Sequence, residues 1–266
     1  MSKLLKMLAS EKLTREQREL VKSLKGSLKD ETKTSFLKKR NFSASGLYYS
    51  SGACARKWQM LFEGVEAVDT WKHTSLRSVS AGTSSHEDLQ KAFLAENPGL
   101  EVEKELWHHD PEIHAFVDIY DPELNIPIEI KTTSKENFEW RMSKFVGNDY
   151  HEKQLLTYMK ILNAKVGFLF YEDRNSYDTL VIPVFMDEAN TKFIDDAFEW
   201  MKKIEAVHKS GEKIKVFEGK RVNSKICSDC PIKAACDNGP IGTVSIPLLT
   251  KWEGKQVVNN VSDGVS

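Results

Sequence analysis

Residues 126 to 134 have the sequence "IPIEIKTTS", in which apolar and polar side chains alternate as they do in a β-strand. Successive side chains of a strand point to opposite faces, so Glu129 and Lys131 share one face. Ile126, Ile128 and Ile130 share the other face, which can be buried. The carboxylate and the ammonium group beside it are then either an exposed ion pair or part of a catalytic site.

The segments around this strand predict an α/β fold with a central mixed β-sheet flanked by helices. Helical patterns cover 84–97, 149–163 and 188–209, and the first is ended by "NPG" at 97–99. Strand patterns cover 101–109, 113–121, 126–134, 165–173 and 178–186. The helix at 149–163 joins two strands of an otherwise hairpin-rich sheet. A strand–helix–strand crossover of this kind indicates that one pair of strands is parallel.

The composition restricts the function classes. The chain has 266 residues, 40% of them apolar, and a formal net charge of −1, so overall charge gives no argument for nucleic acid. The first forty residues nevertheless carry twelve Lys and Arg against five Asp and Glu, a local balance of +7. We expect a basic helical N-terminal arm over 1–40, which either packs on the body or contacts DNA. The main domain is expected over 41–237 and a C-terminal tail over 238–266, with "SIPLL" at 245–249 docked on the body.

The opening residues, "MSKLLKMLASEKL", are interrupted by Lys6 and Glu11 and are too charged for the apolar core of a signal peptide. No stretch approaches the roughly 18 uninterrupted apolar residues of a membrane-spanning helix. We therefore expect a cytoplasmic protein with no membrane partner. In that compartment the four cysteines are expected to be metal ligands or free thiols rather than disulfides.

A second carboxylate is expected beside the first. Asp118 lies eleven residues before Glu129, near the end of the strand predicted at 113–121. If the two strands pair across the "PELN" turn, Asp118 and Glu129 meet on one face. Each would raise the pKa of the other unless a cation neutralised them. A hard divalent cation suits such oxygen ligands, and Lys131 beside it could orient an attacking water or stabilise the transition state.

This order of residues resembles the PD-(D/E)xK nuclease superfamily, whose core carries Asp, a spacer and then Glu-x-Lys on adjacent strands. Two further features are similar to its RecB-like family. "GTSSHE" supplies a histidine, His86, on the preceding helix, and "QLLTY" supplies Gln154 and Tyr158 four residues apart on the following one. Taken alone, His86 is a capping or solvated residue, and Gln154 with Tyr158 is a surface pair. The chain departs from the family at Ala115, where the family often has Gly.

The resemblance implies a restriction-endonuclease-like core and a role for each of these residues. His86, Asp118, Glu129 and the backbone carbonyl of Ile130 would bind Mg²⁺ or Mn²⁺. Lys131 would act on the attacking water, and Gln154 and Tyr158 would position Lys131 and the DNA backbone.

The cysteines form an uneven set. Cys227, Cys230 and Cys236 lie close together, and Cys54 is 173 residues before the first of them. A zinc ribbon would need a second close pair. The spacing is similar to that of the iron–sulfur branch of the same family, which includes CRISPR-associated adaptation nucleases and AddB-type nuclease domains. That resemblance implies a 4Fe-4S cluster. A four-cysteine zinc site and unligated thiols stay open as alternatives.

The resemblance covers 41–237 and implies a metal-dependent deoxyribonuclease, an exonuclease acting on DNA ends or single strands, with a helicase, recombination or CRISPR adaptation complex as a partner. It also implies a DNA path lined by Ser43, Ser45, Arg56 and Lys57, where basic groups would contact phosphates. One alternative is a DNA-binding subunit that uses the fold to hold DNA. Another is a structural protein stabilised by zinc.

Overall fold

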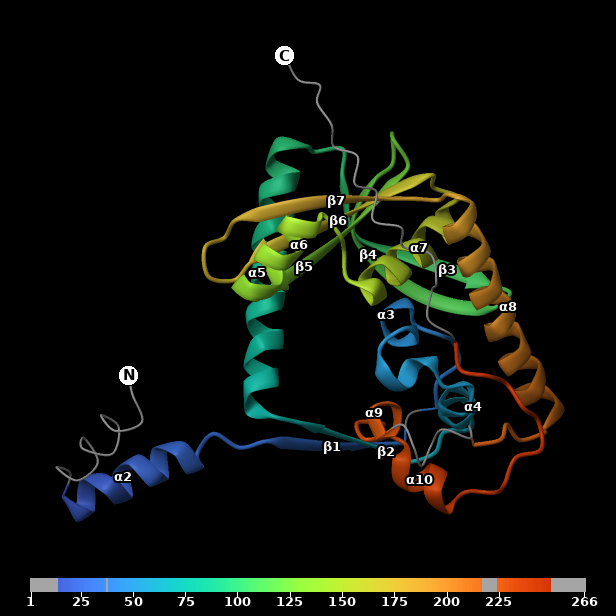
Figure 1. The fold of residues 1–266 in the computed structure, drawn as a ribbon, viewed down its shortest axis with the longest axis horizontal. Helices are drawn as coiled ribbons and strands as arrows, with labels where there is room; N and C mark the ends of the chain where they lie inside the picture. Colours follow the sequence, from blue (N-terminus) through green and yellow to red (C-terminus); the bar gives the residue numbers. More distant parts are fainter. Residues whose placement is uncertain (1–13, 37, 217–223, 250–266) are drawn as a thin grey trace.

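The computed structural model describes residues 14–36, 38–216 and 224–249. Its centre is a five-stranded sheet in the order β3-β4-β5-β6-β7 (Figure 1). The strands are β3 (Glu101–His109), β4 (Glu112–Asp121), β5 (Ile126–Thr133), β6 (Val166–Asp173) and β7 (Thr179–Phe185). β5 and β6 are parallel, and the other neighbours are antiparallel. The predicted mixed sheet is therefore confirmed.

The parallel pair is joined by a crossover of two helices, α6 (Lys135–Lys144) and α7 (Asp149–Leu162). The sequence patterns predicted α7 but not α6. The reason is that α6 buries Phe138 and Arg141, while Trp140 and Met142 are exposed, so it has no continuous apolar stripe.

Helices cover both faces of the sheet. α7 lies against β5 and β6, where a Cβ added at Gly167 would come within 3.0 Å of Leu155 and 3.1 Å of Met159. On the other face is α5 (His73–Glu96), whose Phe93 ring lies 5.0 Å from that of Phe170. α5 begins eleven residues before the predicted helix at 84–97, and its exposed first half extends away from the sheet (Figure 1). α8 (Glu188–Ser210) completes the helical layers.

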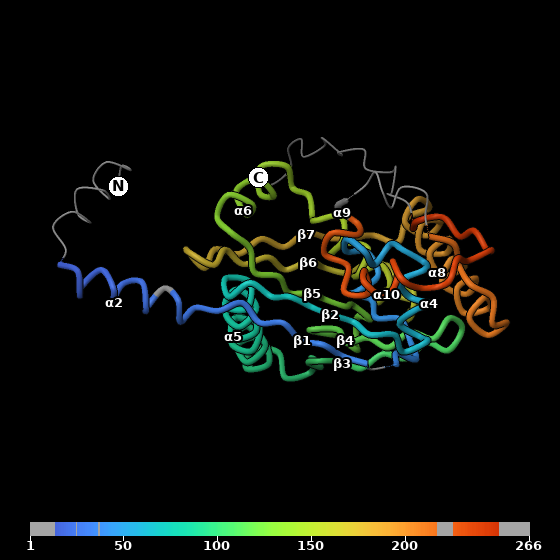
Figure 2. The backbone as a smooth tube through the Cα atoms, turned by 90° about the horizontal axis from the view of Figure 1, so that it is seen from below, coloured from blue at the N-terminus to red at the C-terminus, as the bar shows by residue number. Residues whose placement is uncertain are grey.

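A separate layer contains the segment before α5. It comprises β1 (Glu31–Ser35) and β2 (Ala67–Trp71), which pair antiparallel, and α3 (Ala44–Leu47), η1 (Ser50–Ala53) and α4 (Ala55–Glu63). Two short helices of the C-terminal region, α9 (Ser224–Cys227) and α10 (Lys233–Asn238), lie beside α4 and the β1–β2 pair (Figures 1 and 2). Phe42 attaches this layer to the sheet, because its N–H donates to Glu112 O at 2.8 Å and its C=O accepts from His114 N at 3.0 Å.

The predicted arm is only in part a helix. α2 covers Arg15–Gly26, and residues 31–35 are a strand, while the predicted segment 1–13 lies outside the described residues. Leu20 and Leu24 of α2 are 60% and 61% exposed, and both views have α2 standing away from the body (Figures 1 and 2). Helix α2 is therefore not packed on the body, whereas β1 of the same arm is paired with β2.

Residues 245–249 do contact the body, as expected. Leu249 N donates to Ala53 O at 2.9 Å, and Trp200 Nε1 donates to Pro247 O at 2.8 Å. The rest of the predicted tail, 250–266, lies outside the described residues. None of the described helices combines the length and the apolar character that crossing a bilayer requires.

The packing of α7 on the sheet gives a stability prediction. Leu155→Ala removes a fully buried side chain (0% exposed) from this contact and should lower the free energy of unfolding by about 2–5 kcal/mol. Leu124→Ala, at a site 65% exposed, should change it by less than about 0.5 kcal/mol. Urea unfolding followed by circular dichroism measures both. Equal effects would contradict the placement of α7.

Candidate active site

Asp118 is held where β4 and β5 stop pairing. The ladder between these strands runs from Asp121 opposite Ile126 to Ile119 opposite Ile128. Beyond this point a side chain accepts the next backbone hydrogen bond: Asp118 Oδ2 accepts from the N–H of Ile130 at 2.6 Å. The side chain thus replaces a ladder carbonyl. Asp118 is thereby fixed beside Glu129, as the spacing of the two residues predicted.

Glu129 lies at the centre of a buried hydrogen-bond chain. It is 1% exposed, and its Oε1 accepts from Lys131 Nζ and from Gln154 Nε2, the latter at 2.7 Å. Gln154 Nε2 also donates a hydrogen bond to the Tyr158 hydroxyl oxygen at 2.6 Å. The structure therefore brings together four residues that the sequence assigned to one site. The other carboxylate oxygen of Glu129, Oε2, is buried and has no hydrogen-bond partner among the described residues.

Burial dominates the electrostatics of these groups. It raises the pKa of Glu129 to about 8, against the lowering effect of Lys131, and it also raises the pKa of Asp118. For Lys131, burial lowers the pKa, but Glu129 and Asp118 outweigh it and the net shift is upward. Lys131 is therefore an ammonium group at neutral pH, and the carboxylates hold protons more readily than exposed ones do.

His86 approaches the same carboxylates from α5. Its Nδ1 lies 3.9 Å from Asp118 Oδ1. Burial lowers its pKa, although Asp118 opposes the shift, so the ring is neutral near pH 7 and can offer a lone pair to a metal. Hydrogen bonds hold α5 on the sheet here: Ser85 donates to Glu172, and Gln90 Nε2 donates to Asp118 O at 3.1 Å.

The chemistry of this donor set fits a hard divalent cation. It offers a neutral imidazole and two carboxylates, one of which has a buried oxygen without a partner among the described residues, and a cation would favour the charged forms that burial disfavours. Among the described residues, however, no three His, Cys, Asp or Glu side chains stand at the spacing of a formed metal site. The ligands would have to close around an ion as it binds.

The sequence did not identify Glu103 as a neighbour of this site. Glu103 has a positive φ of 49° and is omitted from the β3–β4 pairing, in which Val102 faces Ile119 and Lys104 faces Val117. Asp118, the residue opposite it, is likewise missing from the pairing and the register is unchanged, so Glu103 marks a local break in the ladder rather than an inserted residue. Gln90 Nε2 donates to Glu103 Oε1 at 2.7 Å, which holds this third carboxylate close to Asp118. In the sequence Glu103 looks like any residue of the alternating "EVEKE".

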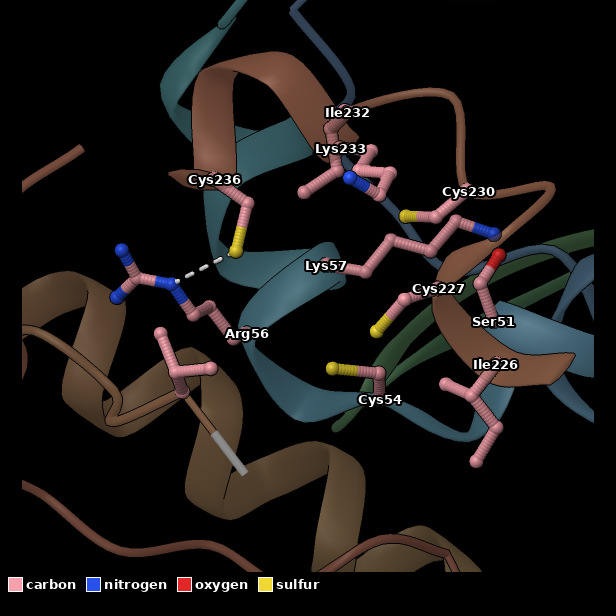
Figure 3. A pocket seen from close by; sticks show the side chains of 11 residues that line it. Ser51, Cys54, Arg56, Lys57, Ile226, Cys227, Cys230, Ile232, Lys233 and Cys236 are labelled. Atoms are coloured by element: carbon pink, nitrogen blue, oxygen red, sulfur yellow. Dashed lines mark hydrogen bonds between the residues drawn. The ribbon is translucent and has the colours of Figure 1, made fainter. Parts of the chain in front are cut away.

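The four cysteines line one cavity, although Cys54 is far from the others in sequence (Figure 3). Figure 3 shows the sulfur atoms of Cys54 and Cys227 directed toward each other, whereas Cys236 accepts a hydrogen bond from Arg56 Nε at 3.3 Å. Burial raises the pKa of Cys54 to about 11 and also raises that of Cys230. The sulfurs share a cavity, but they are not grouped around one metal position. An iron–sulfur cluster is not evident.

Two of the residues expected on a DNA path have other surroundings. Arg56 is 3% exposed, and its Nη1 and Nη2 donate to Ile214 O at 2.6 Å and Pro240 O at 2.8 Å. A guanidinium group occupied in this way cannot reach phosphates, so that expectation does not fit the fold. Lys57 lines the cysteine cavity, with Nζ 5.6 Å from the centre of the Trp58 ring. Ser43 and Ser45 lie at the start of α3, and only Ser45 is fully exposed.

A second polar chain, also absent from the sequence interpretation, runs beside Lys131. Tyr171 faces Lys131 in the parallel register of β5 and β6, so their side chains lie on the same face. The Tyr171 hydroxyl accepts from Asn148 N at 2.9 Å and lies 2.9 Å from His151 Nδ1. Burial lowers the pKa of His151 to about 2, so its ring is neutral and can accept the Tyr171 hydroxyl hydrogen.

This buried histidine gives a pH prediction. Between its unfolded pKa of about 6.5 and its folded pKa of about 2, the unfolded chain binds one more proton than the folded chain. Stability should therefore be lost as the pH falls from about 6.5. His151→Gln, which keeps a hydrogen-bond acceptor, should flatten this loss in urea unfolding measured from pH 7 to pH 4. His109→Gln, whose parent side chain is 81% exposed, should leave it unchanged. Parallel pH profiles for His151→Gln and the wild type would contradict the buried neutral state.

Comparison with known proteins relates the chain by fold alone. No family model and no curated protein matches it. Among solved structures, LHK-Exo in complex with dAMP matches with a TM-score of 0.50 and 14% identity, over 64% of this chain and 90% of that one. The alkaline exonuclease LHK-Exo from Laribacter hongkongensis matches with a TM-score of 0.49 and 14% identity, over 66% and 92% of the two chains. SSO0001 matches with a TM-score of 0.44 and 16% identity, over 85% and 97%. The chain thus has a mixed α/β fold that resembles the fold of LHK-Exo.

Proposed function

We propose that the protein is a metal-dependent deoxyribonuclease that acts as an exonuclease on DNA ends or single strands. One observation carries the proposal: Glu129 is buried and Asp118 is 15% exposed next to the Lys131 ammonium group, and Glu129 keeps an oxygen without a partner among the described residues. Two largely buried carboxylates are costly unless a cation uses them. The resemblance to an exonuclease fold, including a structure with bound dAMP, supports DNA as the substrate class.

The proposed metal ligands are His86, Asp118, Glu129 and the carbonyl of Ile130. A bound Mg²⁺ or Mn²⁺ would make a water molecule more acidic and stabilise charge on a phosphoryl oxygen. Lys131 remains protonated at neutral pH, so it cannot take a proton from that water. It can instead donate hydrogen bonds to the water or to a phosphate oxygen, which stabilises the negative charge that develops in the transition state.

Gln154 and Tyr158 are proposed to orient the carboxylate rather than to react. Gln154 Nε2 donates to Glu129 Oε1, the oxygen that Lys131 also contacts. Glu129 Oε2 would then be the oxygen that binds the metal. Tyr158 is 2% exposed, and burial raises its pKa well above its usual range, so it stays a neutral hydroxyl.

Two substitutions test the reaction. Glu129→Gln and Lys131→Met keep the volume of each side chain and should each lower the rate of DNA cleavage at least about 100-fold, because each removes a charge that acts on the transition state. The assay uses end-labelled linear and circular DNA, single- and double-stranded, with Mg²⁺ or Mn²⁺. Lys135→Met, at an exposed lysine of α6 (60% exposed side chain), is the matched control and should cut at the wild-type rate.

Cleavage of linear but not circular DNA is expected of an exonuclease. A near wild-type rate for Glu129→Gln or Lys131→Met would contradict the assignment of the site. DNA binding by the wild type without cleavage under any of these conditions would favour a DNA-holding subunit instead.

We also propose that the cysteine cavity holds a 4Fe-4S cluster that joins α4 to the α9–α10 region. The support is that four cysteines from two distant parts of the chain line one cavity. A zinc ion, with Zn–S bonds of about 2.3 Å, would draw its four sulfurs to within about 4 Å of one another. The described cysteines do not stand at the spacing of a formed metal site, so the choice between a zinc ion and a cluster rests on metal analysis.

Metal analysis separates the two alternatives. Protein purified without oxygen should be brown and contain about four irons per chain. Cys54→Ser should lose the colour as fully as Cys230→Ser does. A colourless protein with one zinc would contradict the cluster and leave the nuclease proposal intact, whereas full iron content in Cys54→Ser would remove Cys54 from the ligands.

A further inference from the structure

Arg141 is a buried positive charge that the proposed reaction does not use. It lies on α6 and is 7% exposed. Its Nε is buried without a hydrogen-bond partner, and within the described residues its recorded contacts are with aromatic rings rather than with carboxylates. Burying this donor without a hydrogen bond in return is unfavourable, because the N–H group loses its contact with water. Such a group calls for an explanation.

The position of Arg141 places it one side chain away from Lys131. Its Cζ lies 5.0 Å from the centre of the Tyr171 ring, and Tyr171 faces Lys131 across the β5–β6 pair. Tyr150, at the start of α7, adjoins both cations. Burial raises the pKa of Tyr150, and the charges of Lys131 and Arg141 oppose that shift. Arg141 therefore belongs to the surroundings of the candidate active site and not to a distant part of the core.

The rings around Arg141 attract its positive charge, but no hydrogen bond from Nε to either ring or to another described residue is present. Tyr171 and Trp140, at 5.0 and 5.9 Å, attract the guanidinium cation through their faces. Tyr171 is itself held by hydrogen bonds to Asn148 and His151, so the platform is rigid. The planar guanidinium group presents its N–H groups as a fork, which matches two oxygens of a phosphate.

A nearby carboxylate, that of Glu152, is the alternative partner for the Arg141 guanidinium group. Glu152 of α7 is 4% exposed and contributes to the raised pKa of Tyr171, for which burial is the main cause. No ion pair within 4.0 Å joins it to Arg141 among the described residues, although Glu152 has other contacts. The observed arrangement therefore leaves the donors of Arg141 available to a ligand.

We propose that Arg141 binds a phosphate group of the DNA strand next to the scissile phosphodiester, while Lys131 and the metal ligands act on the scissile group itself. This inference rests on the proposed nuclease function and adds a substrate-binding residue to it. A phosphate oxygen pair supplies both the negative charge and the acceptors that the buried guanidinium lacks. Trp140, 53% exposed beside it, lies at the surface where a strand would arrive.

The test compares variants of one helix in DNA binding without divalent metal. Arg141→Gln should raise the Kd for a short single strand roughly tenfold or more, the value of a charge-assisted hydrogen bond. It should also reduce the slope of log K against log salt by about 0.7, the loss of one phosphate contact. Lys144→Gln, an exposed cation in the last turn of the same helix, is the matched control and should change neither value as much.

Arg141→Lys separates geometry from charge. It keeps the positive charge but loses the fork, so its salt slope should stay near that of the wild type while its Kd rises. Circular dichroism and urea unfolding verify that each variant is folded. If Arg141→Gln and Arg141→Lys both fail to fold, the melting temperature of the wild type provides the test. Inorganic phosphate should raise it above the value in chloride of equal ionic strength. Equal melting temperatures would overturn the proposal.

Oligonucleotides with and without a terminal phosphate distinguish the two sources of the ligand. A loss of affinity in Arg141→Gln that persists on 5′- and 3′-hydroxyl strands supports a backbone phosphodiester. A loss confined to strands with a terminal phosphate supports a terminal monoester as the phosphate that is bound. If folded Arg141→Gln binds every strand as the wild type does, with the same salt slope, Arg141 is not a phosphate ligand. That result would not contradict the proposed Mg²⁺-dependent cleavage. A wild type that binds DNA through Arg141 but never cleaves it would contradict only the nuclease proposal.

Discussion

The parallel pairing of β5 with β6 is the constraint on which the rest of the site depends. Two parallel neighbours cannot be joined by a tight turn, so the chain must return across the sheet, and it does so as α6 and α7. The return lays α7 over the face that carries Glu129, and it sets Tyr171 beside Lys131. Gln154, His151 and Arg141 all belong to this crossover. An antiparallel pair at this position would have left that face open to water.

The site stores unfavourable electrostatic energy that a ligand can release. Burial raises the pKa of Asp118 and of Glu129, which means that each charge is less stable here than in water. Arg141 is buried nearby, and its Nε has no hydrogen-bond partner among the described residues, so cationic and anionic groups are both incompletely compensated. A divalent cation on one side and a phosphate on the other would compensate the two sets together. Binding of metal and of DNA should consequently favour each other.

The strands that carry the site could be predicted from the sequence, because each is a period-two pattern bounded by turn residues. β4 and β5 follow that pattern. The spacing of four residues between Gln154 and Tyr158 likewise predicted that both lie on one face of a helix. The prediction failed where local pattern does not determine structure. α6 has no apolar stripe, and Glu103 interrupts the β3–β4 ladder with a positive φ of 49° that no alternation of residues predicts. Arg56 looked like a DNA-contacting residue because its hydrogen-bond acceptors, Ile214 O and Pro240 O, lie 158 and 184 residues away along the chain.

Those two contacts of Arg56 bear on the order in which the chain can mature during synthesis. α4 leaves the ribosome early. The carbonyl groups that accept hydrogen bonds from Arg56, those of Ile214 and Pro240, are synthesised only after the whole sheet has emerged. Until then the group must stay hydrated, so α4 cannot bury this face. The sheet and its crossover helices contain their own partners and can fold first, as units of a growing chain do. The layer that contains Cys54 is therefore a late-assembling part of the molecule, and a chain cut short before residue 214 would present α4 with an unfilled interior face.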